Sequence, residues 1–311
     1  MIMKLVRQPQ FIIGVLFISF LLFFSFYWPV LLDVNKQESL KLMDFLYDKE
    51  GRIIDAAPFS PSQVPPVGTD LFGKNIFYQV IDGAKYTILI AIAIACLRIL
   101  FSVGITLLNP RSSFSFLNDI VQATLYIPTA IIAYIFMSSL LMKHSMEPMS
   151  VMKLIVFQCA ILIGIGVPPL ISTFSREIKS ILNKDHITNT FALGAKKPYV
   201  YYRHVLPELS TKLILLFAQQ VIQTLILMAH LGVLAIFIGG SSTVVLGDIF
   251  TPIPVSIPIA GEWAGIIGMN FPKLKAAPWA ILTPLAFFAV SIFALNLIIQ
   301  GIQNCLETNK S

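Results

Sequence analysis

A few polar side chains interrupt long apolar runs of this chain, and their types and spacing limit the chemistry they could do. Arg98 lies between the apolar runs 88–97 and 99–108. Gln219, Gln223 and His230 follow one another at i, i+4 and i+11, so they share one face if the segment is helical. Such groups can bind a passing solute, or they can join helices through hydrogen bonds. All four are candidates for a translocation pathway, and the second alternative stays open for each.

No set of residues is arranged for catalysis. The phosphate-binding pattern G-x-x-x-x-G-K-[ST] is absent, and the Gly-Lys pair at 73–74 matches only part of it. Cys96, Cys159 and Cys305 lie far apart without clustered histidines or acids, so we expect neither a disulfide nor a metal site. We therefore expect a protein that is not an enzyme and that binds no cofactor itself.

Membrane helices are the elements that would have to position the four pathway candidates. Hydrophobic residues make up 56% of the 311 residues and charged residues only 12%, against about 25% charged residues in soluble domains. The apolar runs are continuous rather than alternating, which favours helices over a barrel. The net charge of +6 fits basic loops that meet anionic lipid headgroups better than nucleic acid. The sequence predicts an all-α polytopic membrane protein.

Six spans are predicted, at 10–32, 84–108, 118–142, 152–173, 211–238 and 278–302. The first is too long for a signal-peptide core and no cleavage site follows it, so we expect 1–32 to be a short stub and a retained helix. Residues 33–83 should lie outside the membrane, with 75–84 running along the interface. Pro168 and Pro169 are expected to close the fourth span. The core is predicted at 84–302, with a loop at 174–210 and a tail at 303–311.

Basic residues in short loops set the predicted orientation. Most of them share one side, which holds Lys4, Arg7, Arg111, Arg176, Lys179, Lys184, Lys196, Lys197, Arg203 and Lys212. The other side holds Lys143, Lys153, Lys273 and Lys275 besides the long first loop. We therefore predict that both termini are cytoplasmic.

The most informative stretch follows the fourth predicted span. From Phe191 to Leu209 it reads FALGAKKPYVYYRHVLPEL, with a predicted turn at Gly194 between two short helical pieces. Leu206-Pro207 comes just before the fifth span, where a proline can open a helix. A short helix exposed on the cytoplasmic face could dock in a groove of a soluble partner and transmit motion. The alternative is a basic linker that anchors at the headgroups.

This stretch, ALGA-x8-HVLP in Ala192–Pro207, resembles the cytoplasmic EAA loop of binding-protein-dependent ABC permeases. It is most similar to the shorter C-type subunit of the dipeptide/oligopeptide/nickel group. GTDLFGKN at 68–75 and DGAK at 82–85 resemble that group's GTD-x-x-G-R-D and Y-G-A-R segments. EWAG at 262–265, APW at 277–279 and FALNL at 293–297 resemble its EWG, APW and AFNLLGD-x-LRD segments. The likeness covers most of the chain in the right order.

Several positions depart from the group's pattern. The EAA triplet is replaced by Thr-Asn-Thr at 188–190, with Asp185 one turn earlier. Residues 231–239 lack the SFLGLG pattern, and 251–258 form a proline-rich insert. The chain is thus identified as a divergent member.

The resemblance implies a type I ABC importer permease with six helices, in the bacterial plasma membrane, that imports di- or oligopeptides. Separate ABC ATPase subunits would hydrolyse ATP with Mg²⁺ and grip the coupling loop. A second homologous permease would complete the pore, and an extracytoplasmic binding protein would deliver the substrate. By the same resemblance, the coupling residues are Asp185, Ala192, Leu193, Gly194, Ala195, His204, Leu206 and Pro207.

Other functions stay open at this point. Nickel or another small solute is an alternative cargo, although the chain has no histidine-rich or carboxylate-rich membrane face. A secondary transporter or channel would usually show an internal repeat with interrupted helices, and none is evident. The missing EAA glutamate leaves a non-transporting scaffold or sensor subunit as a further alternative.

Overall fold

A computed structural model describes residues 8–32, 45–47, 50–108, 127–246 and 253–307. Six helices in these ranges are long and apolar enough to cross a membrane. They are α2 (Pro9–Leu32), α4 (Ile76–Leu108), α6 (Thr129–Met146), α7 (Val151–Leu182), α10 (Leu206–Val233) and α12 (Trp279–Glu307). The predicted helical membrane architecture with six spans is thereby confirmed.

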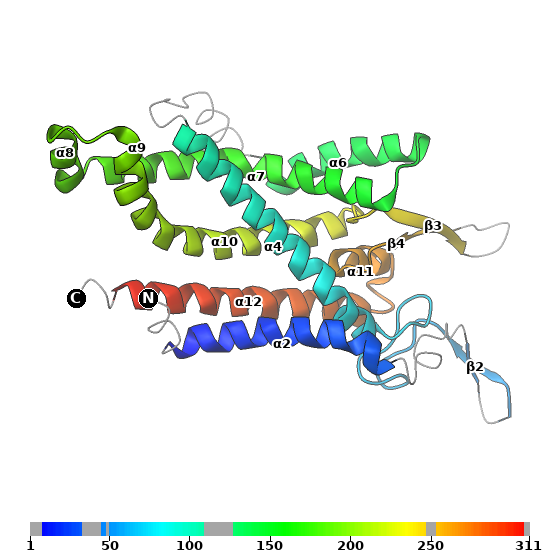
Figure 1. Ribbon diagram of the computed structural model, residues 1–311. Coiled ribbons are helices and arrows are strands. Elements are labelled where there is room, and N and C mark those ends of the chain that lie inside the picture. Colours follow the sequence, from blue (N-terminus) through cyan, green and yellow to red (C-terminus); the bar gives the residue numbers. More distant parts are fainter. Residues whose placement is uncertain (1–7, 33–44, 48–49, 109–126, 247–252, 308–311) are drawn as a thin grey trace.

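Helix α4 crosses obliquely between two groups of helices (Figure 1). On one side α2 packs along α12, and on the other α7 packs with α6 and α10. Small residues bring α2 and α12 close together, since a Cβ added at Gly301 would lie 2.7 Å from Phe11 Cβ. Close contacts at small residues are typical of helices that associate within lipid. The first and last helices are therefore direct neighbours.

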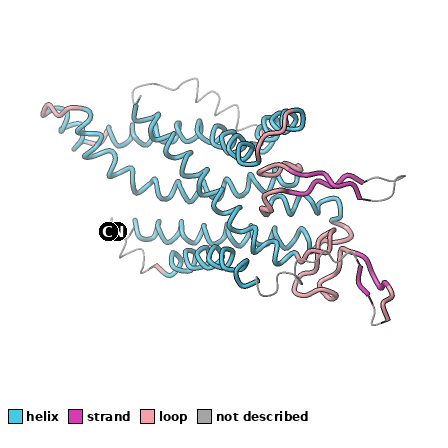
Figure 2. Tube along the Cα trace, turned by 45° about the vertical axis from the view of Figure 1, so that its right-hand side comes forward, coloured by secondary structure: helices cyan, strands magenta, loops and turns pink. Residues whose placement is uncertain are grey.

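Short elements cover the two ends of the bundle. At one end α7 and α10 are joined by α8 (Asp185–Ala192), α9 (Lys197–Val200) and the π-helical turn η1 (Tyr201–Val205). The other end carries α11 (Trp263–Asn270), η2 (Phe271–Lys273) and two antiparallel hairpins that extend beyond the helices (Figure 2). The hairpins are β1 (Phe45–Tyr47) with β2 (Ile53–Ala56), and β3 (Ser241–Leu246) with β4 (Ile253–Pro258), paired from Ser241↔Pro258 to Leu246↔Ile253. Hydropathy did not predict these strands.

The start of α4 and the ends of α7 and α10 differ from the predicted span boundaries. Helix α4 begins at Ile76, so 76–83 continues the membrane helix and is not a separate interfacial segment. Helix α7 runs through Pro168 and Pro169 to Leu182. Two prolines remove two N–H donors, but the remaining bonds and the packing of the helix carry it onward. Helix α10 ends at Val233, earlier than predicted, and 118–126 of the third predicted span lies outside the described residues.

Buried apolar side chains in the described part form two main clusters. The larger cluster lies among α2, α4, α6, α7, α10, α11 and α12 and includes Trp263. The second cluster lies at the α8 end and consists of Leu170, Phe174, Ile178, Ile181, Ile187, Val200, Val205 and Leu209. Many large apolar side chains on the outer faces of the helices are exposed, as expected for surfaces that contact lipid.

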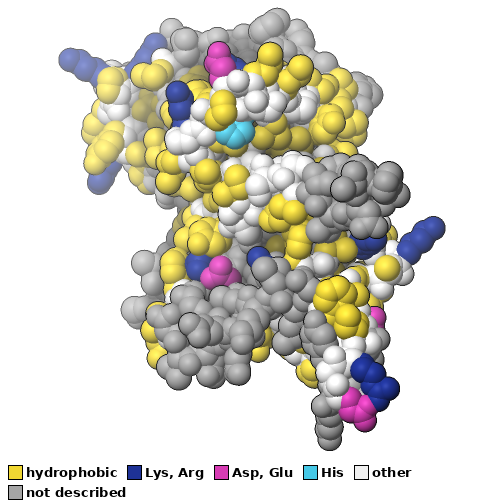
Figure 3. All heavy atoms as spheres, turned by 90° about the vertical axis from the view of Figure 1, so that its right-hand side faces the viewer, with side chains coloured by type: hydrophobic (Ala, Val, Ile, Leu, Met, Phe, Trp, Pro, Cys, Tyr) yellow, Lys and Arg dark blue, Asp and Glu magenta, His cyan; other side chains and the backbone are white. Residues whose placement is uncertain are grey.

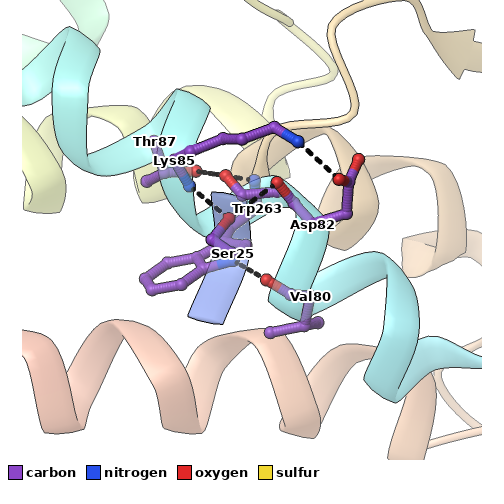
Figure 4. A network of polar contacts seen from close by, with 7 residues as sticks. Ser25, Val80, Asp82, Lys85, Thr87 and Trp263 are labelled. Carbon is purple, nitrogen blue, oxygen red and sulfur yellow. Dashed lines mark hydrogen bonds and ion pairs between the residues drawn. The ribbon is translucent and has the colours of Figure 1, made fainter. Parts of the chain in front are cut away.

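Trp263 holds α11 against α4 and α12 (Figure 4). Its indole Nε1 donates to the Val80 carbonyl at 2.7 Å, and its backbone N–H donates to Thr87 Oγ1 at 3.0 Å. Its ring packs edge-on against Phe287 and Phe288 of α12. One fully buried side chain thus joins three elements of the larger cluster.

Ser25 ties α2 to the same part of α4 (Figure 4). Its hydroxyl donates to the Asp82 carbonyl at 3.2 Å and accepts from the Lys85 backbone N–H at 3.0 Å. The Lys85 ammonium in turn pairs with the Asp82 carboxylate at 2.6 Å. The DGAK segment therefore has a structural role, because it forms the contact between α2 and α4.

The loop that precedes α4 is folded onto the end of the bundle. Phe59 is fully buried, and its N–H donates to Thr69 Oγ1 at 2.8 Å. Trp279 Nε1 donates to the Thr69 carbonyl at 3.1 Å, which fixes the loop to α12. The Asp70 carboxylate accepts from the N–H groups of Phe72 and Lys74 and closes the GTDLFGKN turn. The motif thus builds a rigid cap.

Gly68 in this cap provides a test of the fold. It adopts φ +81°, and an added Cβ would lie 2.6 Å from the Phe59 carbonyl oxygen. Gly68→Ala should lower the melting temperature of the detergent-solubilised protein, because such strain costs about 1–3 kcal/mol. Gly104→Ala in α4 is the control, since no atom in the described part lies within 4 Å of its added Cβ. Equal melting temperatures for the two variants, measured by size-exclusion after heating, would contradict the strain.

Candidate functional site

The predicted coupling residues lie together at the end of the molecule where α8 projects (Figure 1). Helix α8 ends at Ala192, and Gly194 adopts φ +89° while its N–H donates to the Phe191 carbonyl at 2.9 Å. Glycine commonly takes this left-handed conformation just after a helix. Leu193 is 89% exposed, and no described atom lies within 4 Å of a Cβ added at Gly194. Ala192, Leu193 and Gly194 thus form an exposed apolar tip, called the coupling tip below.

The other coupling residues divide between the surface and the base of this segment. Asp185 and Pro207 are exposed like the coupling tip, whereas Ala195, His204 and Leu206 are half-buried. The His204 ring lies 6.1 Å from the ring of Tyr199, between centroids, and is packed rather than free. The eight residues therefore lie at the same end of the molecule, but only the exposed ones are available to a partner.

The base of the segment is joined to two membrane helices. The second cluster packs α8, α9 and η1 against the ends of α7 and α10. Two ion pairs cross from the α7 side to α10, Lys184–Glu208 and Lys212–Glu177. Exposed pairs of this kind contribute only about 0–1 kcal/mol each. Burial of the apolar side chains is therefore the main stabilising contribution at this end.

Arg98 is buried where α4 meets α7 and α10. Its Nη2 and Nε both donate to the Leu162 carbonyl, at 2.6 and 3.1 Å. Its Nη1 donates to Gln220 Oε1 and to Thr224 Oγ1, each at 3.2 Å. All of these acceptors are neutral. In this conformation Arg98 is only 3% exposed, so it has the geometry of a structural donor that joins three helices.

Gln219, Gln223 and His230 lie on the exposed face of α10, as their spacing predicted. Polar side chains exposed in this way are costly against lipid, so this face is expected to meet water or another polypeptide. Gln223 Oε1 accepts from Gln220 Nε2 at 2.9 Å. Since Gln220 also accepts from Arg98, the exposed face and the buried guanidinium are connected through one side chain.

Gln220 and Thr224 were missed by the sequence reasoning. They follow Gln219 and Gln223 by one residue, and the same i, i+4 spacing was available as a signal. Both are buried and face Arg98, whereas Gln219 and Gln223 point outward. Helix α10 therefore carries two rows of polar side chains. The buried row, Gln220 and Thr224, accepts hydrogen bonds from the Arg98 guanidinium of α4.

Glu262 is a fully buried carboxylate at the hairpin end. From the sequence it was noted only as part of the EWAG motif, without a predicted role. It caps α11, where Oε2 accepts from the Gly265 N–H at 2.9 Å and Oε1 accepts from the Ile238 N–H at 3.3 Å. Burial raises the pKa of Glu262 to about 7, and the backbone N–H groups lower it by less. Glu262 therefore fastens the turn after α10 to α11.

Gln158 of α7 fastens the same turn from the other side. Its Nε2 donates to the Phe237 carbonyl at 2.9 Å, and its Oε1 accepts from the Gly239 N–H at 2.8 Å. The side chain is fully buried. The turn between α10 and β3 is consequently held by one amide and one carboxylate from separate helices.

A metal centre is not formed by the part of the chain that the structure describes. No three His, Cys, Asp or Glu side chains come together there in a way that could hold an ion. Cys96, Cys159 and Cys305 are free thiols in separate places. The features that stand out are instead the apolar coupling tip, the hydrogen bonds of Arg98 and the exposed polar face of α10.

Comparison with known proteins gives the class. No family model matches the chain. It is 21% identical over 250 residues to the oligopeptide transport system permease protein OppC of Bacillus subtilis (strain 168), which covers 79% of this chain and 72% of OppC. It is 23% identical over 269 residues to the probable peptide ABC transporter permease protein y4tQ of Sinorhizobium fredii (strain NBRC 101917 / NGR234), which covers 84% of this chain and 81% of y4tQ.

Together with the six apolar helices, these similarities define a multi-pass permease of the bacterial inner membrane. More particularly, the similarity to two peptide ABC transporter permeases supports a divergent permease that resembles the Opp type. The sequence-based assignment to this group is therefore confirmed, and the low identities agree with the departures found in its motifs.

The raised pKa of Glu262 predicts a pH-dependent stability. Above its ordinary value of 4.5 and up to about 7, the folded protein holds a proton that the unfolded chain releases. Stability from this group is thus greatest at low pH, falls as the pH rises through about 7, and then levels off. Glu262→Gln cannot titrate, so its melting temperature should change less than that of the wild type from about pH 5 to about pH 8. Parallel melting profiles for the two proteins would show that Glu262 does not contribute.

Proposed function

We propose that this chain is the membrane-spanning permease subunit of an ATP-driven importer of di- or oligopeptides. The single observation that carries the proposal is the coupling tip, an exposed apolar knob on a base packed against α7 and α10. A permease needs such a contact surface because ATP is hydrolysed, with Mg²⁺, on separate ATPase subunits, whose motion has to reach the membrane helices. The names of both relatives, a peptide permease in each case, support the choice of cargo.

The segment formed by α8, α9 and η1, called the coupling segment, can transmit motion from a soluble partner to the membrane helices. A soluble ATPase would receive the coupling tip in a surface groove, with Leu193 as the apolar contact. Closure of the ATPase pair would displace the tip and, through the second cluster, the ends of α7 and α10. Because packed clusters move as units, the displacement rocks the helix bundle between its inward-open and outward-open forms.

The exposed face of α10 is the proposed wall of the translocation pathway, completed by a second homologous permease. Gln219 and Gln223 each carry an amide that can both donate to and accept from the peptide groups of an extended substrate. His230 adds an imidazole at the same face toward the hairpin end. This set of groups suits peptides better than a nickel ion, which would call for several grouped nitrogen, sulfur or carboxylate ligands.

The proposed orientation places the α8 end in the cytoplasm. The segment between α7 and α10 carries four basic residues, Lys184, Lys196, Lys197 and Arg203, and basic residues are typical of short cytoplasmic loops. The hairpin end would then face the extracytoplasmic binding protein. Figure 3 shows that apolar side chains cover much of the visible part of this end, and that basic side chains project from its rim. A protein partner that covers these apolar groups is consistent with this role.

Leu193→Asp tests the coupling tip without backbone strain. In membranes that contain the whole transporter, wild-type chain should co-purify with an ATPase and a second permease after detergent extraction. The charge should reduce the amount of ATPase recovered by at least about tenfold, as expected for loss of a central apolar contact. Leu274→Asp, at an exposed leucine of the opposite end, is the matched control and should not reduce it. If no ATPase accompanies the wild-type chain, the importer proposal fails.

A further inference from the structure

The two apolar clusters are separated by a polar layer that is centred on Arg98. On α4, Ala95 belongs to the larger cluster and Ile99 packs against the second cluster, with Arg98 between them. On α10, Val221 belongs to the larger cluster and Leu216 packs against the second. Between these positions lies Gln220, which accepts from Arg98.

Helix α7 changes from one cluster to the other at the same level. Leu162 belongs to the larger cluster and Leu170 to the second. Between them lie Pro168 and Pro169, whose missing N–H groups leave two carbonyls of the preceding turn without their usual helix bonds. All three helices around Arg98 therefore pass from one apolar cluster to the other within about two turns of the guanidinium.

Gly166 makes room for Arg98 in this layer. A Cβ added at Gly166 would lie 2.6 Å from both Cδ and Cζ of Arg98, too close for any real contact. The guanidinium passes over this glycine to reach the Leu162 carbonyl. Ser102, one turn along α4, also donates to the Val167 carbonyl at 3.3 Å. The contact between α4 and α7 at this level thus includes hydrogen bonds from Arg98 and Ser102 to backbone carbonyls of α7.

We propose that the Arg98 layer is the joint between two parts of the permease, and that Arg98 is its positioning residue. The larger cluster is the part that carries the pathway, and the second cluster with α8 and α9 is the part that the ATPase moves. Hydrogen bonds to a flexible guanidinium can tilt and exchange acceptors, whereas close-packed apolar side chains resist such motion. This inference rests on the proposed function, because it assigns the joint to ATP-driven coupling.

The joint is also connected to the exposed face of α10. Gln220 accepts from Arg98 and donates to Gln223, which faces the proposed pathway. A substrate that competes for the Gln223 amide would therefore change the partners of Gln220 and bias the same joint that the coupling tip moves. Arg98 is buried in this conformation, so it acts on transport through the helices that it positions.

The test uses the whole transporter in lipid nanodiscs, with peptide-loaded binding protein as the stimulus. Arg98→Met keeps the length of the side chain but removes every donor. We expect the assembled complex to lose about tenfold in stimulated ATP hydrolysis, while the KM for ATP stays unchanged. Arg98→Lys should recover part of the loss, because an ammonium can reach the Leu162 carbonyl but cannot serve three acceptors with the same fork.

Glycine variants supply the decisive control. Gly166→Ala should uncouple the complex as Arg98→Met does, because it displaces the guanidinium. In combination the two changes should be no worse than either alone, since both remove the same contact. Gly164→Ala, half a turn away where no described atom lies within 4 Å of the added Cβ, should behave as wild type.

Each outcome decides the proposal. Wild-type stimulation in an assembled Arg98→Met complex overturns it, as does a double variant whose losses multiply. If Arg98 variants do not assemble, the comparison of Gly166→Ala with Gly164→Ala decides. Loss of stimulated ATP hydrolysis in Gly166→Ala but not in Gly164→Ala supports the joint. Equal stimulated ATP hydrolysis in the two variants overturns it. A wild-type chain that brings no ATPase refutes the proposed function, and the joint fails with it for that separate reason.

Discussion

The membrane interior offers Arg98 no water, so the helices around it must supply its hydrogen bonds. That requirement sets the rotation of α7, which has to present the Leu162 carbonyl, and of α10, which has to present Gln220 and Thr224. It also demands a residue without a side chain at Gly166. The mutual arrangement of α4, α7 and α10 therefore depends on one charge that is satisfied entirely by neutral partners. The apolar side chains above and below this layer pack around an arrangement that Arg98 defines.

The spans could be predicted from the sequence because hydropathy is a local property, set by each segment alone. The ends of the helices depend on contacts with distant segments, and these could not be predicted. Helix α4 extends back to Ile76 where Trp263, far along the chain, bonds to its first turns. Helix α7 continues past Pro168 because its lower half is packed in the second cluster. The hairpins were missed since strands of three to six residues resemble loops in a hydropathy profile.

In the candidate site, too, local features could be predicted from the sequence, whereas contacts between distant segments could not. The coupling tip could be placed from its motif, and Gly194 has the left-handed conformation that a glycine after a helix suggests. The acceptors of Arg98 could not, because they lie 64 to 126 residues away along the chain. Nor does the spacing distinguish Gln219 from Gln220, although one residue turns a side chain by about 100° around a helix. Only the packed structure shows which glutamine faces the charge.

The packing of α2 along α12 has a consequence for how the protein is made. Helix α2 is synthesised long before α12, against which it packs, where Phe11 meets Gly301 and Gln10 bonds to Asn304. Helix α2 therefore lacks this contact until α12 has been synthesised, and before then it can pack on α4 and contact lipid. The contact between α2 and α12 is thus one of the late steps in assembly of the helices, and it joins the segments that lie farthest apart among the described helices.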